Sequence, residues 1–225
     1  RGYVTHVFAP DEPSDRELAD LDGIVGTVPS FGPDDLAWLR WCAAHYVAPL
    51  SVVLGRTVPP NVPRSTASVG TWPGPGFSVE AVASGDDPFG AISERIVASS
   101  GSTLVVAPTI EEVEAIVERL SEDGLAPEIA HSGLVAKEVT SSWVAAATRP
   151  GTVLVGTREV ALWPVAGLSR IIVVEDARRV MRSPSTPTIA VRDVALARAR
   201  AHGIPVTFLA PIPSLEVLAA GARVV

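Results

Sequence analysis

Several residue types on which common functions depend are scarce or absent in this 225-residue sequence. Cys42 is the single cysteine, which excludes a disulfide within the chain and a zinc site built from several thiolates. No apolar run reaches the roughly 18 residues of a membrane-spanning helix, and no signal-peptide pattern stands at the beginning. We therefore expect a cytoplasmic protein without a membrane partner. Because the sequence begins at Arg1, we also expect a fragment of a longer chain.

Positive charge is also scarce. The sequence has 18 basic and 25 acidic residues, which leaves a net charge of −7, and Lys137 is its one lysine. This charge argues against a broad basic face for nucleic acid, so any contact with DNA must depend on a few arginines. Hydrophobic residues make up 47% of the chain, enough for a substantial buried core.

From residue 78 onward, short apolar runs alternate with segments of helical periodicity. The expected strands are residues 79–83, 103–107, 128–130, 153–155, 171–174 and 206–209. The expected helices are residues 89–98, 108–120, 135–147, 191–201 and 214–220. Thr109 is a candidate N-cap for the second of these helices. Alternation of this kind predicts an α/β domain with a parallel sheet and right-handed crossovers.

The first third of the chain follows a different pattern. Residues 34–46 and 49–54 predict two helices that precede a break at a run of prolines. We expect Trp38, Trp41 and Tyr46 to pack in a core, with stacking on nucleotide bases as the alternative. Residues 64–77 are rich in Ser, Gly and Pro and predict a linker. The chain is thereby divided into residues 1–63, a linker and a domain of residues 78–225.

Polar residues follow two of the apolar runs. Thr157 and Arg158 come after residues 153–155, and Glu175 and Asp176 come after residues 171–174. Ligands of open α/β sheets bind at the carboxyl ends of strands, so both pairs are candidates for a phosphate or nucleic-acid site. The structural alternatives are an Arg158 that pairs with one of the two carboxylates, and carboxylates that are simply solvated.

Several segments resemble, in the same order, the PriA family of bacterial replication-restart helicases, also called primosomal protein N′. The resemblance rests on LAWLRWCAAHYVAPLSVVLGRTVPPNV, LVVAPTIEEVEAIVERL, AHSGL, GTREVALWPVAGLSRIIVVED, AVRDVALARARAHGIPV and LAPIPSLEVLAAG. It implies a RecA-like helicase lobe at residues 78–225, preceded by the end of an N-terminal domain that binds the 3′ end of DNA. No room exists between them for the family's winged-helix domain.

The resemblance also implies ligands and partners. These are branched or 3′-ended DNA, single-strand DNA-binding protein and other primosome proteins. ATP and magnesium serve the family's helicase activity, and zinc binds a module C-terminal to this lobe. Because Cys42 is the single cysteine, no zinc is expected in this chain. In the family's Gly-Thr-Arg segment, here Gly156 to Arg158, the resemblance implies that Thr157 and Arg158 contact the DNA backbone.

The elements of ATP hydrolysis are degenerate. A phosphate loop needs glycines, a lysine and a Ser or Thr, but the corresponding stretch contains Gly85, Asp86 and Asp87 and no lysine. These aspartates would repel a triphosphate, and an acidic loop that caps a helix is the alternative interpretation. No nucleotide is therefore expected to bind here.

The metal-binding strand is altered as well. The family's Asp-Glu-Glu-His aligns with Val174, Glu175, Asp176 and Ala177, which leaves Glu175 at the catalytic position. If this alignment is shifted by one residue, Asp176 takes the position of a metal ligand. The Gly-Ser-Ala-Thr motif, which couples ATP to DNA in the family, has lost its hydroxyls before Pro211.

We therefore interpret the chain as a degenerate replication-restart protein that binds stalled or branched forks without helicase activity. A residual ATP-dependent 3′-to-5′ helicase, an unrelated α/β nucleotide-binding enzyme and a purely structural lobe are the alternatives. His131 and Ser132 are a weak candidate for nucleophilic catalysis, since no third orienting residue is evident, and a loop histidine is the simpler interpretation.

Overall fold

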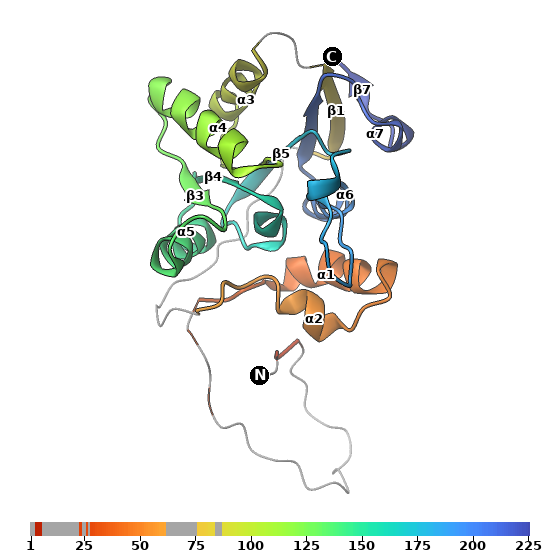
Figure 1. Cartoon of the computed structure of the whole chain (residues 1–225). Helices are drawn as coiled ribbons and strands as arrows, with labels where there is room; N and C mark the ends of the chain where they lie inside the picture. The colour runs from red at the N-terminus through yellow and green to blue at the C-terminus, as the bar shows by residue number, and fades with distance from the viewer. Residues whose placement is uncertain (1–2, 6–22, 24–25, 27, 62–75, 84–86) are drawn as a thin grey trace, which may run out of the picture.

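The computed structural model describes residues 3–5, 23, 26, 28–61, 76–83 and 87–225. Within these residues the chain forms one seven-stranded sheet covered by helices on both faces (Figure 1). The strands are β1 (Ser78–Ala83), β2 (Ser102–Val106), β3 (Glu128–Ala130), β4 (Val153–Gly156), β5 (Leu168–Val174), β6 (Pro205–Ala210) and β7 (Arg223–Val224). The α-helices are α1 (Pro33–His45), α2 (Leu50–Leu54), α3 (Pro88–Val97), α4 (Ile110–Glu122), α5 (Ala136–Thr148), α6 (Val191–His202) and α7 (Leu215–Ala219).

All neighbouring strands of the sheet are parallel. Their order is β3-β4-β2-β5-β6-β1-β7, so four of the expected strands lie side by side as β4, β2, β5 and β6. Val105 of β2 stands between Val155 of β4 and Ile172 of β5, and all three side chains are fully buried. The prediction of a parallel α/β domain is confirmed, and the sheet has the parallel arrangement expected of a RecA-like lobe.

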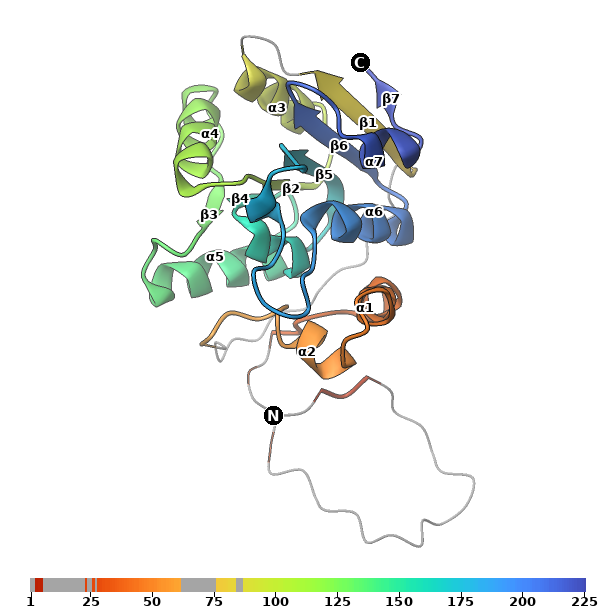
Figure 2. The same cartoon turned by 45° about the vertical axis from the view of Figure 1, so that its right-hand side comes forward.

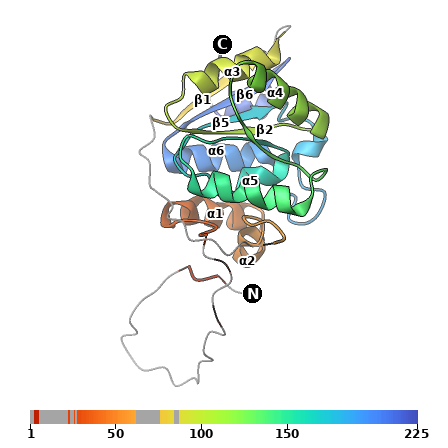
Figure 3. The same cartoon turned by 90° about the vertical axis from the view of Figure 1, so that its left-hand side faces the viewer.

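The helices form layers on the two faces of the sheet. Figure 3 shows α3 and α4 on one face, α5 and α6 on the other, and α1 and α2 outside α5 and α6. Helix α4 shows how the local sequence determines where a helix begins and which side of it is buried. Thr109 caps it by accepting a hydrogen bond from the backbone N–H of Glu112, and its apolar side is buried against the sheet. The predicted N-cap is thereby confirmed.

The helices α1 and α2 share the core of the α/β domain. Leu39, Cys42 and Val53 are fully buried in the same hydrophobic cluster as the sheet residues that face α5 and α6. Figure 2 shows α1 lying beneath α6. The predicted linker lies mostly outside the described residues, so the division of the chain at residues 64–77 stays a prediction. The structure shows that residues 28–61 pack on the domain as part of one core.

Polar contacts join α1 to α6. The buried guanidinium of Arg198 lies 5.2 Å from the centre of the Trp38 ring, and His202 Nε2 lies 3.0 Å from Asp35 Oδ1. Burial raises the pKa of Asp35, but hydrogen bonds from His202, Gly32 and Trp38 and the charge of Arg198 together outweigh it and lower the pKa to about 2. The carboxylate of Asp35 is therefore part of the attachment of α1.

A second polar contact holds the end of α1. The Tyr46 hydroxyl donates to Asp193 Oδ2 at 2.7 Å and accepts from the backbone N–H of Ala190 at 2.9 Å. Both partners lie at the beginning of α6, so Tyr46 fixes where the two helices meet. The described N-terminal segment is consequently held by specific polar contacts in addition to apolar packing.

The aromatic residues of α1 separate into two kinds. Trp38 is buried and Tyr46 is half-buried, as expected, but Trp41 is 41% exposed and stacks on His45 with ring centres 4.5 Å apart. The expectation of core packing is wrong for Trp41. Successive residues of an α-helix are about 100° apart around its axis. The buried residues Trp38, Leu39, Cys42 and Ala43 therefore lie on one side of α1, and Trp41 lies outside that side.

Candidate nucleic-acid interface

The residues that correspond to a phosphate loop contribute a helix cap. Gly85 and Asp86 lie outside the described residues. Asp87 is the N-cap of α3, and its Oδ1 accepts a hydrogen bond from the backbone N–H of Gly90 at 2.8 Å. This hydrogen bond lowers the pKa of Asp87, and Arg119 forms an ion pair with its Oδ2 at 3.0 Å. Asp87 is therefore a capping carboxylate at the N-terminus of α3, the place where a phosphate would need to bind.

Asp176 is a buried carboxylate with two partners on one oxygen. Its side chain is 1% exposed, its Oδ2 forms an ion pair with Arg192 Nη1 at 3.0 Å, and the same oxygen accepts a hydrogen bond from Ser214 at 2.8 Å. The interpretation of Asp176 as a solvated residue is wrong, because Arg192 at the beginning of α6 folds back over the end of β5. A magnesium ion would have to displace this guanidinium, so Asp176 does not fit a metal ligand.

Glu175 is held by a neighbouring arginine. Its backbone has φ of 46°, which is uncommon for a residue with a side chain, and its Oε2 lies 3.1 Å from Arg178 Nη1. The same Nη1 forms an ion pair with Glu112 at 2.7 Å. Among the described residues, no group of three His, Cys, Asp or Glu side chains is arranged to hold a metal ion. The residues present at this edge therefore do not fit the ATP and magnesium that the resemblance implies.

The Gly-Thr-Arg segment lies elsewhere, at the end of β4. Thr157 and Arg158 follow Gly156, and the chain then enters a 3₁₀ helix, η1 (Arg158–Leu162). A Cβ atom at Gly156 would overlap the carbonyl oxygen of Ala130 on β3 and the side chain of Val160. Only glycine permits this close approach, so the turn that presents Arg158 depends on it.

Arg158 has partners other than those expected. Its Nη2 forms an ion pair with Glu159 Oε1 at 3.0 Å, and its Nη1 donates to the carbonyl oxygen of Val180 at 3.3 Å. Thr157 also donates to Glu159, at 2.9 Å. The structural alternative, in which Arg158 pairs with Glu175 or Asp176, is wrong, because the strand that carries them is separated from β4 by β2. The half-exposed Arg158 instead lies beside residues 178–182.

Residues 178–182 form an arginine-rich segment that the sequence analysis missed. Arg178, Arg179 and Arg182 are exposed, and a 3₁₀ helix, η2 (Arg179–Met181), is anchored by the buried Met181. Within the described residues, Arg179 and Arg182 have no carboxylate at ion-pair distance. The detectable signal was the density of three arginines within five residues in a chain of net charge −7.

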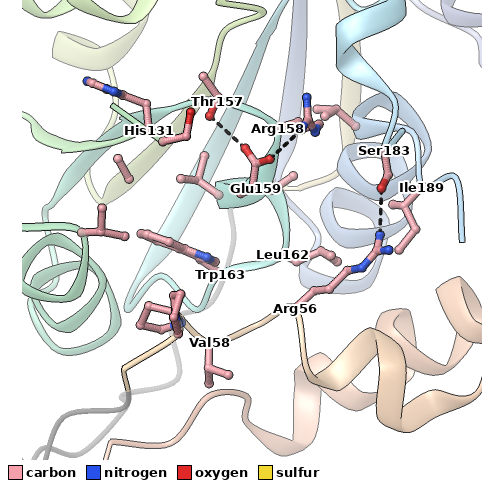
Figure 4. Close-up of a pocket in the computed structure, with 18 of the residues that line it drawn as sticks. Arg56, Val58, His131, Thr157, Arg158, Glu159, Leu162, Trp163, Ser183 and Ile189 are labelled. Carbon is pink, nitrogen blue, oxygen red and sulfur yellow. Dashed lines mark hydrogen bonds and ion pairs between the residues drawn. The ribbon is translucent and has the colours of Figure 1, made fainter. Parts of the chain in front are cut away.

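A cavity of about 580 Å³ lies beside this segment (Figure 4). It is bounded by residues 56–60, the ends of β3 and β4, η1, residues 183–185 and the beginning of α6. Its apolar walls include Val58, Pro59, Leu134, Val139, Leu162, Trp163, Ile189 and Val194. Its polar lining includes Arg56, Thr157, Arg158, Glu159 and Ser183. The cavity therefore lies at the carboxyl edge of β3 and β4, where ligands of α/β sheets bind.

His131 lines the cavity in a structural role. Its Nδ1 accepts a hydrogen bond from the backbone N–H of Gly133 at 3.2 Å, and its side chain is not bonded to Ser132. This contact is typical of a loop histidine. The geometry gives no support to nucleophilic catalysis by Ser132.

A known protein resembles part of this chain. No family model matches the chain. The chain is 27% identical over 124 residues to the replication restart protein PriA of Bacillus subtilis (strain 168), and the match covers 55% of this chain. The same match spans 15% of the length of that relative. Among the described residues, no helix is long and apolar enough to cross a membrane.

Proposed function

We propose that this chain binds branched or 3′-ended DNA during replication restart and that it does so without hydrolysing ATP. The observation that carries the proposal is the position of Arg158 at the end of β4, beside the exposed Arg179 and Arg182. In an acidic chain, such a local group of arginines is where phosphates are attracted. The similarity to a replication restart protein supports the biological setting. Single-strand DNA-binding protein and primosome proteins are the partners proposed with it.

The absence of ATP hydrolysis is proposed from the edge formed by β1, β5 and β6. Arg192 and Ser214 occupy the carboxylate of Asp176, and Asp87 caps α3 with a negative charge. The competing proposal of a residual helicase predicts a DNA-stimulated ATPase that Glu175→Gln abolishes. We expect no turnover above background in either the wild type or this variant.

The test of DNA binding is a titration of fork DNA at two salt concentrations. Arg158→Ala is expected to weaken binding whatever the DNA sequence, and to reduce the slope of log affinity against log salt by about one. Arg149→Ala is the matched control, because Arg149 is a 70% exposed arginine whose ion pair with Glu128 lies away from the cavity. Equal affinities and slopes for wild type and Arg158→Ala would remove Arg158 from the interface. No binding by the wild type would favour a purely structural lobe.

A further inference from the structure

Two buried tryptophans differ in whether their indole N–H group has a hydrogen-bond acceptor. Trp143 Nε1 donates to the backbone carbonyl of Thr57 at 2.8 Å. Trp163 is 4% exposed and lines the cavity, no described residue accepts a hydrogen bond from its Nε1, and this nitrogen is not among the fully buried atoms that lack a partner. Figure 4 shows this nitrogen pointing to the side of the cavity on which Leu162 and Arg56 lie. Because indole N–H groups of buried tryptophans usually find an acceptor, this nitrogen gives the cavity a donor without an acceptor among the described residues.

Two cations lie on the same side of the cavity. Arg56 is bonded through Nη1 to Ser183 Oγ at 3.3 Å and to the carbonyl oxygen of Pro187 at 3.1 Å. Burial lowers the pKa of Arg56, and repulsion by the charge of Arg158 lowers it further, whereas Glu159 acts in the opposite direction. Arg56 and Arg158 line the same cavity and repel each other, and Glu159, which forms an ion pair with Arg158 at 3.0 Å, offsets part of this repulsion. A bound anion would relieve this repulsion.

The walls of the cavity add a third requirement. Its volume of about 580 Å³ falls within the range of small-molecule sites, and most of its lining is apolar. Pro60, Pro184 and Ser185 line the cavity and are exposed, so it is continuous with the surface beside the arginine-rich segment. An occupant must be largely apolar, must offer an acceptor to Trp163, and must carry a negative charge near Arg56 and Arg158.

We infer that this cavity takes one unstacked nucleobase of a bound DNA strand. A base has an apolar face and carbonyl or ring-nitrogen acceptors on its edge, and the adjoining phosphate supplies the negative charge. The base lies against the apolar walls and accepts from Trp163 Nε1, while the phosphate meets Arg158 and Arg56. This inference rests on the proposed DNA binding and adds to it a specific position at which the strand is held by its base.

The experiment compares fork DNA with the same DNA that carries an abasic residue, moved one position at a time through the unpaired strand. Binding of a base in a protein pocket contributes on the order of tenfold to affinity. The wild type is therefore expected to lose roughly tenfold in affinity at one abasic position. Trp163→Phe keeps an aromatic ring but removes the donor, and is expected to reduce this loss. Arg158→Ala is expected to weaken binding to both DNAs by the same factor.

A second variant keeps the test valid if Trp163→Phe fails to fold. Val58→Trp, at a half-buried wall of the cavity, is expected to fill it and to make base-containing and abasic DNA bind equally. Val52→Trp is its control, because Val52 is an exposed residue of α2 that does not line the cavity. A Val58→Trp protein that still discriminates against the abasic DNA would overturn the inference.

The remaining outcomes separate this inference from the function on which it rests. Tight fork binding by the wild type with no sensitivity to any abasic position would overturn the base pocket and leave DNA binding intact. Such a result would fit an aromatic side chain of a protein partner instead. No fork binding at all would overturn both. A free deoxynucleoside monophosphate could instead compete with fork DNA while fork binding is insensitive to every abasic position. That result would identify a free nucleotide as the occupant of the cavity and would contradict binding of a base from a DNA strand.

Discussion

Two parts of the carboxyl edge of one sheet are built in opposite ways. At the ends of β5 and β6, the polar groups bond one another: Asp176 is covered by Arg192 and Ser214. At the ends of β3 and β4, a cavity contains the indole N–H of Trp163, which no described residue accepts, and two arginines whose repulsion Glu159 offsets in part. We call these the closed edge and the open edge. Buried polar groups that lack partners are what a ligand can satisfy, so binding is expected at the open edge.

The largest expected effect comes from breaking the closed edge. Arg192→Ala leaves the Asp176 carboxylate buried without a counter-ion, which is expected to lower the free energy of unfolding by about 3–5 kcal/mol. Denaturant unfolding provides the measurement. In the double variant Arg192→Met with Asp176→Leu, much of this loss should be recovered. A loss below about 1 kcal/mol, as for an exposed ion pair, would show that the ion pair of Arg192 with Asp176 is not shielded from water.

Acid should weaken the ionic attachment of α1 to α6. The pKa of Asp35 is lowered from its ordinary value of 3.8 to about 2 in the folded protein, so its contribution to stability is complete above about pH 5 and is lost as the pH falls toward 2. The shift corresponds to about 2 kcal/mol. Asp35→Asn should abolish this part of the pH dependence. The exposed Asp34→Asn is the control, and identical acid unfolding of both variants would contradict the assignment.

The two buried tryptophans allow a smaller, matched test. Trp143→Phe removes the hydrogen bond to the carbonyl oxygen of Thr57, whereas Trp163→Phe removes an indole N–H that no described residue accepts. We expect Trp143→Phe to destabilise the protein by about 1 kcal/mol more than Trp163→Phe. Thermal or denaturant unfolding of the two variants checks this difference. Equal losses would indicate that Trp163 is satisfied in the free protein.

The smallest effect on stability is expected in the arginine-rich segment. Arg179 and Arg182 are exposed, so Arg179→Ala and Arg182→Ala should each change the free energy of unfolding by less than about 0.5 kcal/mol. Each should nevertheless reduce the log–log salt slope of fork binding by about one if it contacts a phosphate. Unchanged salt slopes in both variants would show that Arg179 and Arg182 do not contact DNA, and would leave only the cavity as the interface.

The parallel sheet could be predicted because short segments of the sequence are enough to identify each strand and each helix. The runs that became β2, β4, β5 and β6 are short, apolar and rich in β-branched residues, and each lies between segments of helical periodicity. Thr109 could be assigned as an N-cap for the same reason. The predictions that these patterns supported are the ones that the structure confirms.

The properties of the two edges depend on distant contacts that a single sequence does not encode locally. Nothing in the sequence indicates that Arg192 returns to Asp176, or that Arg56 approaches Ser183 across 127 positions. The donor of Trp163 was hidden inside a motif that was interpreted only as a family resemblance. That no described residue accepts from it becomes visible only when the neighbouring acceptors are placed.

Hydrogen exchange of the wild-type protein, free and saturated with fork DNA, tests the contrast between the two edges in one measurement. The account predicts slower amide exchange at residues 157–163 and 178–185, which carry η1 and the arginine-rich segment. We expect no change at residues 87–90, at the beginning of α3, or at residues 210–216 of the closed edge. Protection confined to residues 87–90 and 210–216, with none at residues 157–163, would contradict the account.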